Sequence, residues 1–202
     1  MAPADAAAKV ILTRGAGGRG YSASPGLVPT RLVAAFPLPE RVAERARDGV
    51  AVRRCTLQLS EQPRLAGAKT LNRLENVLAR AEWDDASFAE GLLGDPGGRV
   101  IEATMSNVFV VTAGRVATPR LDRCGVVGAQ RERVREMLAA EGIACVEREI
   151  PWADLEAADE IFLTSSLVGA CPVRAFEAWQ RDPGPVTRRV QALIAAADGD
   201  PA

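Results

Sequence analysis

The chain has 202 residues, of which 48% are hydrophobic and 25% are charged, a composition typical of a folded globular protein rather than a disordered one. Its 25 basic and 26 acidic residues give a net charge of −1, which offers no attraction for nucleic acid or an acidic membrane, so we expect a small-molecule substrate. The absence of histidine excludes Ser-His-Asp triads and HExxH zinc sites.

The cysteines are dispersed along the chain rather than paired at short spacing: Cys55, Cys124, Cys145 and Cys171. This pattern argues against a zinc site or a small disulfide framework, and it fits a reducing compartment. No apolar run reaches the ~18 residues of a membrane span. We therefore expect a cytoplasmic protein with no metal site and with neither a nucleic-acid nor a membrane partner.

In the first half of the chain, short apolar runs predict strands at 10–13, 30–36 and 50–59, with a turn at 45–49 before the third. Residues 70–83 follow as a helix, because apolar residues recur at helical spacing. These are Leu71, Leu74, Val77, Leu78 and Ala81, which we expect to form one buried face.

In the second half, strands are predicted at 99–103 and 107–112, with a hairpin at Gly114. A helix over 129–141 ends at Gly142, a residue suited to the left-handed cap position. The remaining elements are a strand at 144–150, a helix at 152–157, strands at 161–165 and 172–176, and a final helix at 186–197. The alternation of strands and helices indicates a mixed α/β or α+β fold.

The sequence RGAGGRGY at 14–21 carries the GxGxxG spacing of dinucleotide-binding loops, but Pro25 and Gly26 follow where such a loop must open a helix. That interpretation is therefore rejected. Two others remain: an ordinary glycine-rich turn, which spacing alone favours, or a loop that presents Arg14, Arg19 and Tyr21 to an anionic substrate.

Lys69 lies in GAKTLNRLEN, at the start of the helix predicted over 70–83, and is one of only two lysines among the 25 basic residues. Most lysines near a helix are merely solvated. Arginine can replace lysine for charge and solubility but cannot act as an amine nucleophile, so a lysine kept in an arginine-rich chain is a mild indication of chemistry.

Three further segments carry polar groups at places where a ligand could bind. Glu102 lies among apolar strand residues, although it could also lie on a solvated strand face. Gly125 and Gly128 precede a helix, where free N–H groups and the helix dipole favour an anion such as phosphate, although the segment could also be an ordinary helix start. Thr164, Ser165 and Ser166 end a strand and could donate to phosphate or cap a turn.

Together, the order and spacing of these segments resemble the class IV aminotransferase family of fold-type IV pyridoxal-phosphate enzymes, from RGAGGRGY to CPV near residue 173. The family signature is similar to the run Glu102, Thr104, Asn107, Val108, Phe109, Thr118, Gly128 and Arg131. Ala129 departs from it, because a larger aliphatic residue is usual there. We expect this to change packing beside the turn without removing backbone donors.

The resemblance implies the cofactor pyridoxal 5'-phosphate and the role of each matching residue. Lys69 would bind the cofactor through its amine and transfer the proton, and burial of the site would lower its pKa. Glu102 would pair with the pyridine nitrogen. The phosphate would be bound by backbone N–H groups of Val127, Gly128 and Ala129 with the hydroxyls of Thr164 and Ser165. Asn72 and Asn107 would order the site, with Arg14, Arg19 and Tyr21 on the substrate side.

Within the family, RGxGxRGY, LAGxKxLNRLEN and SLxGxxPV most resemble the 4-amino-4-deoxychorismate lyase subfamily, whose members form 4-aminobenzoate and pyruvate for folate synthesis. An aminotransferase acting on branched-chain or D-amino acids is one alternative. A catalytically silent homologue that only forms dimers is another. The resemblance also implies a homodimer.

The resemblance begins part-way into the length of the family, so the expected fold is its large cofactor-binding domain, of the D-amino-acid aminotransferase type, with the small N-terminal domain mostly missing. On this interpretation, residues 1–22 are a remnant of that domain with the glycine-rich interdomain loop. Residues 23–202 are then the pyridoxal-phosphate-binding domain.

Overall fold

The computed structural model describes residues 6–199, so the ends of the two predicted domains, 1–5 and 200–202, lie outside the described residues. The chain divides into two compact units, one up to Val42 and one from Ala43 onward, and each is described by itself. The division at residue 22 that the sequence suggests stays a prediction. None of the helices within the described range is long and apolar enough to cross a membrane.

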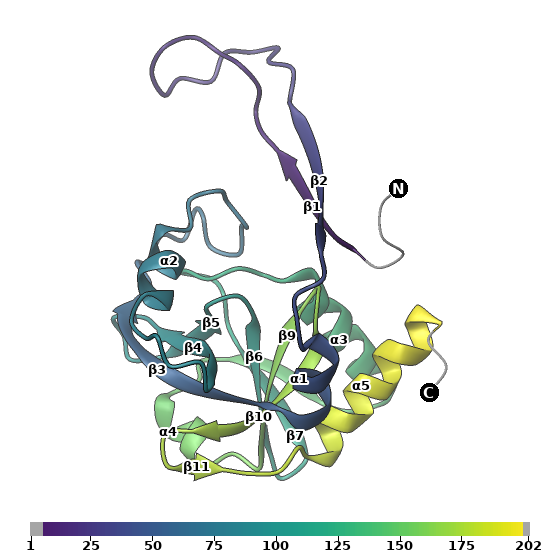
Figure 1. Cartoon of the computed structure of the whole chain (residues 1–202). Helices are drawn as coiled ribbons and strands as arrows, with labels where there is room; N and C mark the ends of the chain where they lie inside the picture. Colours follow the sequence, from purple (N-terminus) through teal and green to yellow (C-terminus); the bar gives the residue numbers. More distant parts are fainter. Residues whose placement is uncertain (1–5, 200–202) are drawn as a thin grey trace. The chain divides into compact units, whose positions relative to one another are not determined.

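The first unit is an antiparallel hairpin of β1 (Ala6–Leu12) and β2 (Arg31–Pro37), paired in register along their whole length (Figure 1). The glycine-rich segment lies in the loop between the two strands. No helix follows this loop before residue 42, which confirms the rejection of a dinucleotide-binding loop.

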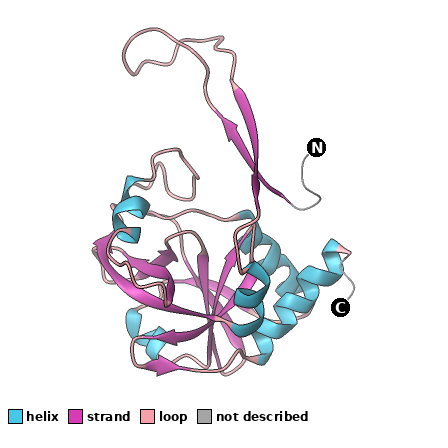
Figure 2. Ribbon diagram, viewed as in Figure 1, coloured by secondary structure: helices cyan, strands magenta, loops and turns pink. Residues whose placement is uncertain are grey.

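The second unit contains one sheet and the helices packed on it (Figure 2). Its strands are β3 (Val50–Gln58), β4 (Phe88–Gly94), β5 (Val100–Ala103), β6 (Asn107–Thr112), β7 (Arg115–Pro119), β8 (Cys145–Arg148), β9 (Glu160–Ser165), β10 (Gly169–Phe176) and β11 (Trp179–Gln180). The helices are α1 (Val42–Asp48), α2 (Leu74–Arg80), α3 (Ala129–Ala140), α4 (Trp152–Glu156) and α5 (Pro185–Asp198).

The strands follow the order β5-β4-β3-β10-β9-β6-β7-β8, with β11 beside β10. This mixed sheet curls until its two edges meet. The N–H of Val100, on β5, donates to the carbonyl of Ile150 just beyond β8 (2.8 Å), and Arg99 forms a bridge with Pro151. Closure satisfies backbone groups that an open edge would leave unpaired.

Strand β6 shows how the sheet separates two hydrophobic layers. Side chains alternate across a strand, so Val108 and Val110 enter the core inside the curl, whereas Phe109 faces the other way. There Phe109 stacks on Phe162 with ring centroids 4.7 Å apart, in a cluster that includes Val134 of α3. Burial on both faces explains why this strand is an almost continuous apolar run.

The structure confirms the predicted strands around 50–59, 99–103 and 107–112 and the helix around 129–141, with boundaries shifted by one residue. The predicted turn at 45–49 is wrong, because residues 42–48 form α1. Gly49 has a φ of 77° and its N–H donates to Arg45 (3.0 Å), so this glycine ends a short helix rather than forming a turn before a strand.

The predicted helix at 70–83 is also wrong in length and in orientation. Helix α2 covers only Leu74–Arg80, and all five apolar residues assigned to a buried face are exposed. Ala79 is the only buried residue of this helix. Periodicity identifies side chains that share a face, but not which face packs on the rest of the protein. Strand β4, with Glu90 and Gly91 in its centre, was not predicted at all.

Candidate functional site

A cavity of about 680 Å³ opens in the second unit, where β5 and β9 end and β6 and α3 begin. It brings together residues from four separate parts of the sequence. Those named as site residues by the sequence are Lys69, Glu102, Asn107, Val127, Gly128, Ala129, Thr164 and Ser165, and all of them line the cavity. The fold therefore gathers the whole predicted cofactor set at one place.

Lys69 lies on the segment between β3 and α2, and this segment is joined to the loop before α3. Gly67 donates its N–H to the carbonyl of Gly125 and accepts the N–H of Val127, both at 3.0 Å. Lys69 itself is exposed, so the expectation of a buried lysine is not met in this structure. Lys69 is nevertheless one of the residues that line the cavity.

Glu102, on β5, is 4% exposed and accepts the N–H of Val126 at 2.8 Å. Burial raises the pKa of this carboxyl from an ordinary 4.5 to about 7, because desolvation disfavours the charged form. The Val126 hydrogen bond and the positive charges of Arg73 and Lys69 act in the opposite direction. Near neutral pH the group is poised between its two states, and a cation placed against it would favour the carboxylate.

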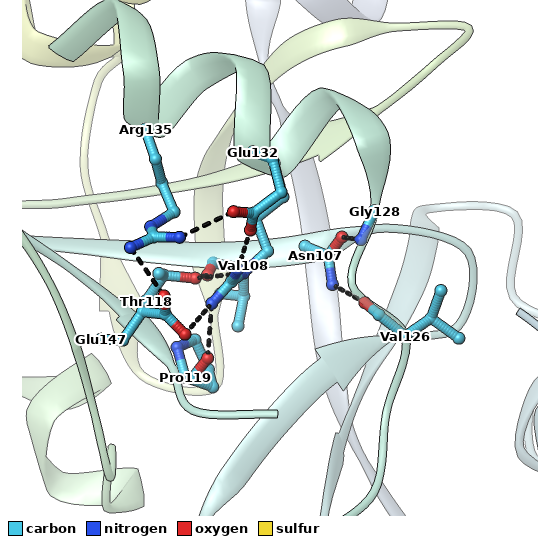
Figure 3. Close-up of polar contacts among 10 residues, drawn as sticks. Asn107, Val108, Thr118, Pro119, Val126, Gly128, Glu132, Arg135 and Glu147 are labelled. Carbon is cyan, nitrogen blue, oxygen red and sulfur yellow. Dashed lines mark hydrogen bonds and ion pairs between the residues drawn. The ribbon is translucent and has the colours of Figure 1, made fainter. Parts of the chain in front are cut away.

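Asn107, the first residue of β6, braces the loop before α3 from both sides of its amide (Figure 3). Its Nδ2 donates to the carbonyl of Val126 (2.7 Å), and its Oδ1 accepts the N–H of Gly128 (3.1 Å). The side chain is buried, so these two bonds also satisfy its own polar atoms. Asn107 thereby sets the conformation of the turn that the sequence assigns to phosphate.

Of the three backbone N–H groups predicted to bind phosphate, two already donate hydrogen bonds within the protein. That of Val127 already donates to Gly67, and that of Gly128 to Asn107. Ala129 is the first residue of the twelve-residue helix α3, so its N–H has no carbonyl four residues earlier within the helix. The helix N-terminus, rather than the whole turn, is the available donor.

Two buried side-chain atoms on the cavity lining have no hydrogen-bond partner among the described residues, the Oγ1 of Thr164 and the Nε2 of Gln130. Unpaired buried polar atoms are costly, and each of these two can donate a hydrogen bond. Ser165 differs, because its Oγ accepts the N–H of Val168 at 3.4 Å. Donors without acceptors beside a helix N-terminus fit the binding of a phosphate group.

The start of α3 is anchored by Arg131, which is only 1% exposed. Its guanidinium donates to Thr118 Oγ1 (3.3 Å) and to the Pro119 carbonyl (3.0 Å), and it lies 3.1 Å from Glu147. Figure 3 shows Thr118, Pro119 and Glu147 below the first turns of the helix. These contacts fix α3 against β7 and hold its N-terminus at the cavity.

Sequence reasoning missed several residues near Glu102, among them Arg73 and Glu90. Arg73 lines the cavity and places a positive charge beside Glu102. Glu90, on β4, is buried behind the bend between β5 and β6 and accepts three hydrogen bonds from it. The only signal for Glu90 was a carboxylate within an apolar run, the same pattern that identified Glu102.

Other predicted residues are not brought to this cavity. Asn72 is exposed and does not line it. Arg14, Arg19 and Tyr21 are exposed residues of the first unit. Their contact with substrate stays a prediction.

A sequence model of the family described as amino-transferase class IV matches residues 2–176, which is most of the chain. The chain belongs to this family. Class IV aminotransferases depend on pyridoxal phosphate, and the curled mixed sheet is that of the fold-type IV enzymes. Relatives named as branched-chain and D-alanine aminotransferases also match.

Three class IV relatives illustrate the range of similarity. The aminodeoxychorismate lyase of Vibrio harveyi is 38% identical over 91% of this chain and 69% of its own length. The 4-amino-4-deoxychorismate lyase structure from Pseudomonas aeruginosa is 42% identical, with a TM-score of 0.86 over 94% of this chain and 70% of that one. An aminotransferase from Brucella abortus bound to pyridoxal phosphate is 27% identical, with a TM-score of 0.69 over 82% and 57%.

Proposed function

We propose that this chain forms the cofactor-binding part of a pyridoxal-phosphate lyase that converts 4-amino-4-deoxychorismate to 4-aminobenzoate and pyruvate, a step of folate synthesis. The observation that carries the proposal is the cavity that joins Lys69, the buried Glu102 and the unpaired Thr164 hydroxyl. Pyridoxal phosphate requires three groups: an amine, an acid and a hydrogen-bond donor that can bind its phosphate. The lyase relatives favour this reaction over other reactions of the family.

The residues present fit the cofactor. Lys69 would bind it covalently, Glu102 would face the ring nitrogen, and the Ala129 N–H with the Thr164 hydroxyl would hold the phosphate. When bound, pyridoxal phosphate supplies a ring that withdraws electrons from the substrate carbon. Lys69, which lines the cavity, would then take and return a proton as general base and acid.

Glu102 contributes by holding a negative charge in a buried place. In the free protein its pKa is about 7, and a positively charged ring nitrogen beside it would lower that value. The substrate ring becomes aromatic as pyruvate leaves, so the protein needs to move protons but needs no second keto acid. Arg14, Arg19 and Tyr21 are proposed to bind the substrate carboxylates.

The reaction itself separates the lyase from an aminotransferase. Purified protein is supplied with pyridoxal phosphate and 4-amino-4-deoxychorismate and with no keto acid, and 4-aminobenzoate and pyruvate are measured. We expect both products in equal amounts. An aminotransferase, which the match to the Brucella enzyme keeps as second candidate, would turn over only when an amino acceptor is added.

A silent homologue is tested by attachment rather than by turnover. The protein is saturated with pyridoxal phosphate and reduced with borohydride, and its peptides are analysed by mass spectrometry. We expect a cofactor adduct on Lys69. Its absence would contradict both enzyme hypotheses and would leave the dimer-forming homologue, whose assembly state can be measured by light scattering. A homodimer is also proposed for the lyase.

A further inference from the structure

Glu90 is a buried carboxylate outside the cavity whose hydrogen bonds all go to one short segment of the cavity wall. It is 8% exposed and does not line the cavity. It accepts the Ser106 hydroxyl at 2.6 Å, the Met105 N–H at 2.8 Å and the Thr104 hydroxyl at 3.3 Å. Three successive residues are therefore held by a single side chain.

That segment joins two buried polar residues of the site, Glu102 and Asn107. Residues 104–106 form the bend between β5, which carries Glu102, and β6, which begins at Asn107. The bend is tight: the N–H of Ala103 donates to the carbonyl of Ser106 at 2.7 Å, and that of Thr104 to the carbonyl of Gly91 at 2.9 Å. All three residues of the bend line the cavity.

We propose that Glu90 is a positioning residue, which fixes the bend at 104–106 and so sets the placement of Glu102 relative to Asn107. The inference rests on the proposed function, because that function supplies the cofactor. The hydrogen bonds of Glu90 are independent of it. A buried carboxylate is costly to desolvate, and satisfying it with three donors from one bend rigidifies that bend. Through Asn107 the effect extends to the turn before α3, because Asn107 bonds both Val126 and Gly128.

The chain contains a matched control in Glu160, another buried carboxylate at 6% exposure. Glu160 accepts the N–H groups of Val186 (2.9 Å) and Thr187 (2.8 Å) and the Thr187 hydroxyl (2.7 Å), at the start of α5. Like Glu90 it accepts three hydrogen bonds, but from two backbone N–H groups and one hydroxyl rather than from one N–H and two hydroxyls, and none of its partners lines the cavity. Glu160→Gln therefore reproduces the loss of stability without touching the bend.

The experiment compares Glu90→Gln, Glu160→Gln and the unchanged protein in two measurements. Amide hydrogen exchange is followed in the cofactor-free protein by mass spectrometry, and the dissociation constant of pyridoxal phosphate is measured by equilibrium dialysis. Glutamine keeps the shape of Glu90, but its NH2 group replaces one accepting oxygen and would face the hydrogen-bond donors of residues 104–106. We expect faster exchange at 104–108 and about tenfold weaker binding for Glu90→Gln, since hydrogen bonds to charged groups are strong.

For Glu160→Gln we expect faster exchange at 186–188 and an unchanged dissociation constant. Equal weakening by both variants, or an unchanged constant for Glu90→Gln, would overturn the proposal. If Glu90→Gln fails to fold, Ser106→Ala removes one of the three bonds and must also speed exchange at 104–108. If the unchanged protein binds no pyridoxal phosphate, the proposed function fails, and the exchange measurement alone decides whether Glu90 holds the bend.

Discussion

Gly128 and Asn107 approach so closely that a side chain at position 128 would displace Asn107. A Cβ there would lie 2.2 Å from the Oδ1 of Asn107, the atom that accepts the Gly128 N–H. The φ of Gly128 is −72°, a value open to any residue, so the restriction comes from space and not from backbone conformation. The hydrogen bonds of Asn107 to the loop before α3 therefore depend on the small size of the residue at position 128.

Gly128→Ala should therefore displace Asn107, destabilise the fold by about 1–3 kcal/mol and weaken the binding of pyridoxal phosphate. The free energy of unfolding in urea and the dissociation constant measure the two effects. Gly18→Ala is the control, because a Cβ at Gly18 meets no atom within 4 Å. Equal unfolding free energies and dissociation constants for the two variants would show that the Asn107 contact tolerates a side chain at position 128.

Lys69→Ala should abolish the covalent adduct, because no other amine lies on the cavity lining among the described residues. Borohydride reduction followed by peptide mass analysis measures the adduct, and the visible absorbance of the bound cofactor should disappear with it. Lys9→Ala changes the other lysine of the chain and should keep both signals. An adduct that survives Lys69→Ala would place the chemistry on another amine.

Glu102→Gln should change how stability depends on pH in the cofactor-free protein. Because the folded-state pKa of Glu102 is about 7 against an ordinary 4.5, the folded state binds more protons within that window. The free energy of unfolding must therefore fall as pH rises from 4.5 through 7, by about 3 kcal/mol in total from this group. The variant lacks this loss, so it should gain stability relative to the unchanged protein between pH 5 and pH 8.5.

Urea denaturation at those two pH values checks this prediction, with the exposed Glu136→Gln as control. The difference between the unchanged protein and Glu102→Gln isolates Glu102 from other titrating groups. If the difference in unfolding free energy between the two proteins does not change with pH, the pKa of Glu102 is not raised in the folded state.

With pyridoxal phosphate added, Glu102→Gln should keep the adduct on Lys69 but slow turnover. Full activity of this variant would contradict the role of Glu102 at the ring nitrogen.

Arg131→Met should be strongly destabilising, by about 3 kcal/mol or more, because it leaves the Pro119 carbonyl and Thr118 without their donor inside the protein. Arg133→Met, on the outer side of the same helix, should have a much smaller effect, since its ion pair with Asp198 is exposed. Thermal unfolding of both variants measures the contrast. Similar melting temperatures would show that Arg131 is not the anchor of α3.

The cofactor set could be named from the sequence because its members lie next to strong local signals. Glu102 and Asn107 are on apolar strands, and Gly128 precedes a periodic helix. Each of these signals needs only a few neighbouring residues. The family resemblance then supplied the roles that spacing alone left open.

What could not be predicted depends on contacts between distant segments. Whether the apolar side of α2 is covered is decided by what packs there, and the helix rests on Ala79 instead. The partners of Glu90 lie 14 to 16 positions further along the chain, and the internal acceptors of Val127 and Gly128 come from two other segments. No local pattern contains that information.

The two hydrogen bonds between Gly67 and the loop before α3 also bear on the order in which the protein folds. They join residues about 60 positions apart, and the entropy lost in closing so long a loop must be recovered by contacts made elsewhere first. We therefore expect the segment bearing Lys69 to dock after the sheet has curled. In a refolding experiment, secondary structure should return before the ability to capture pyridoxal phosphate, and that capture reports the last step of folding.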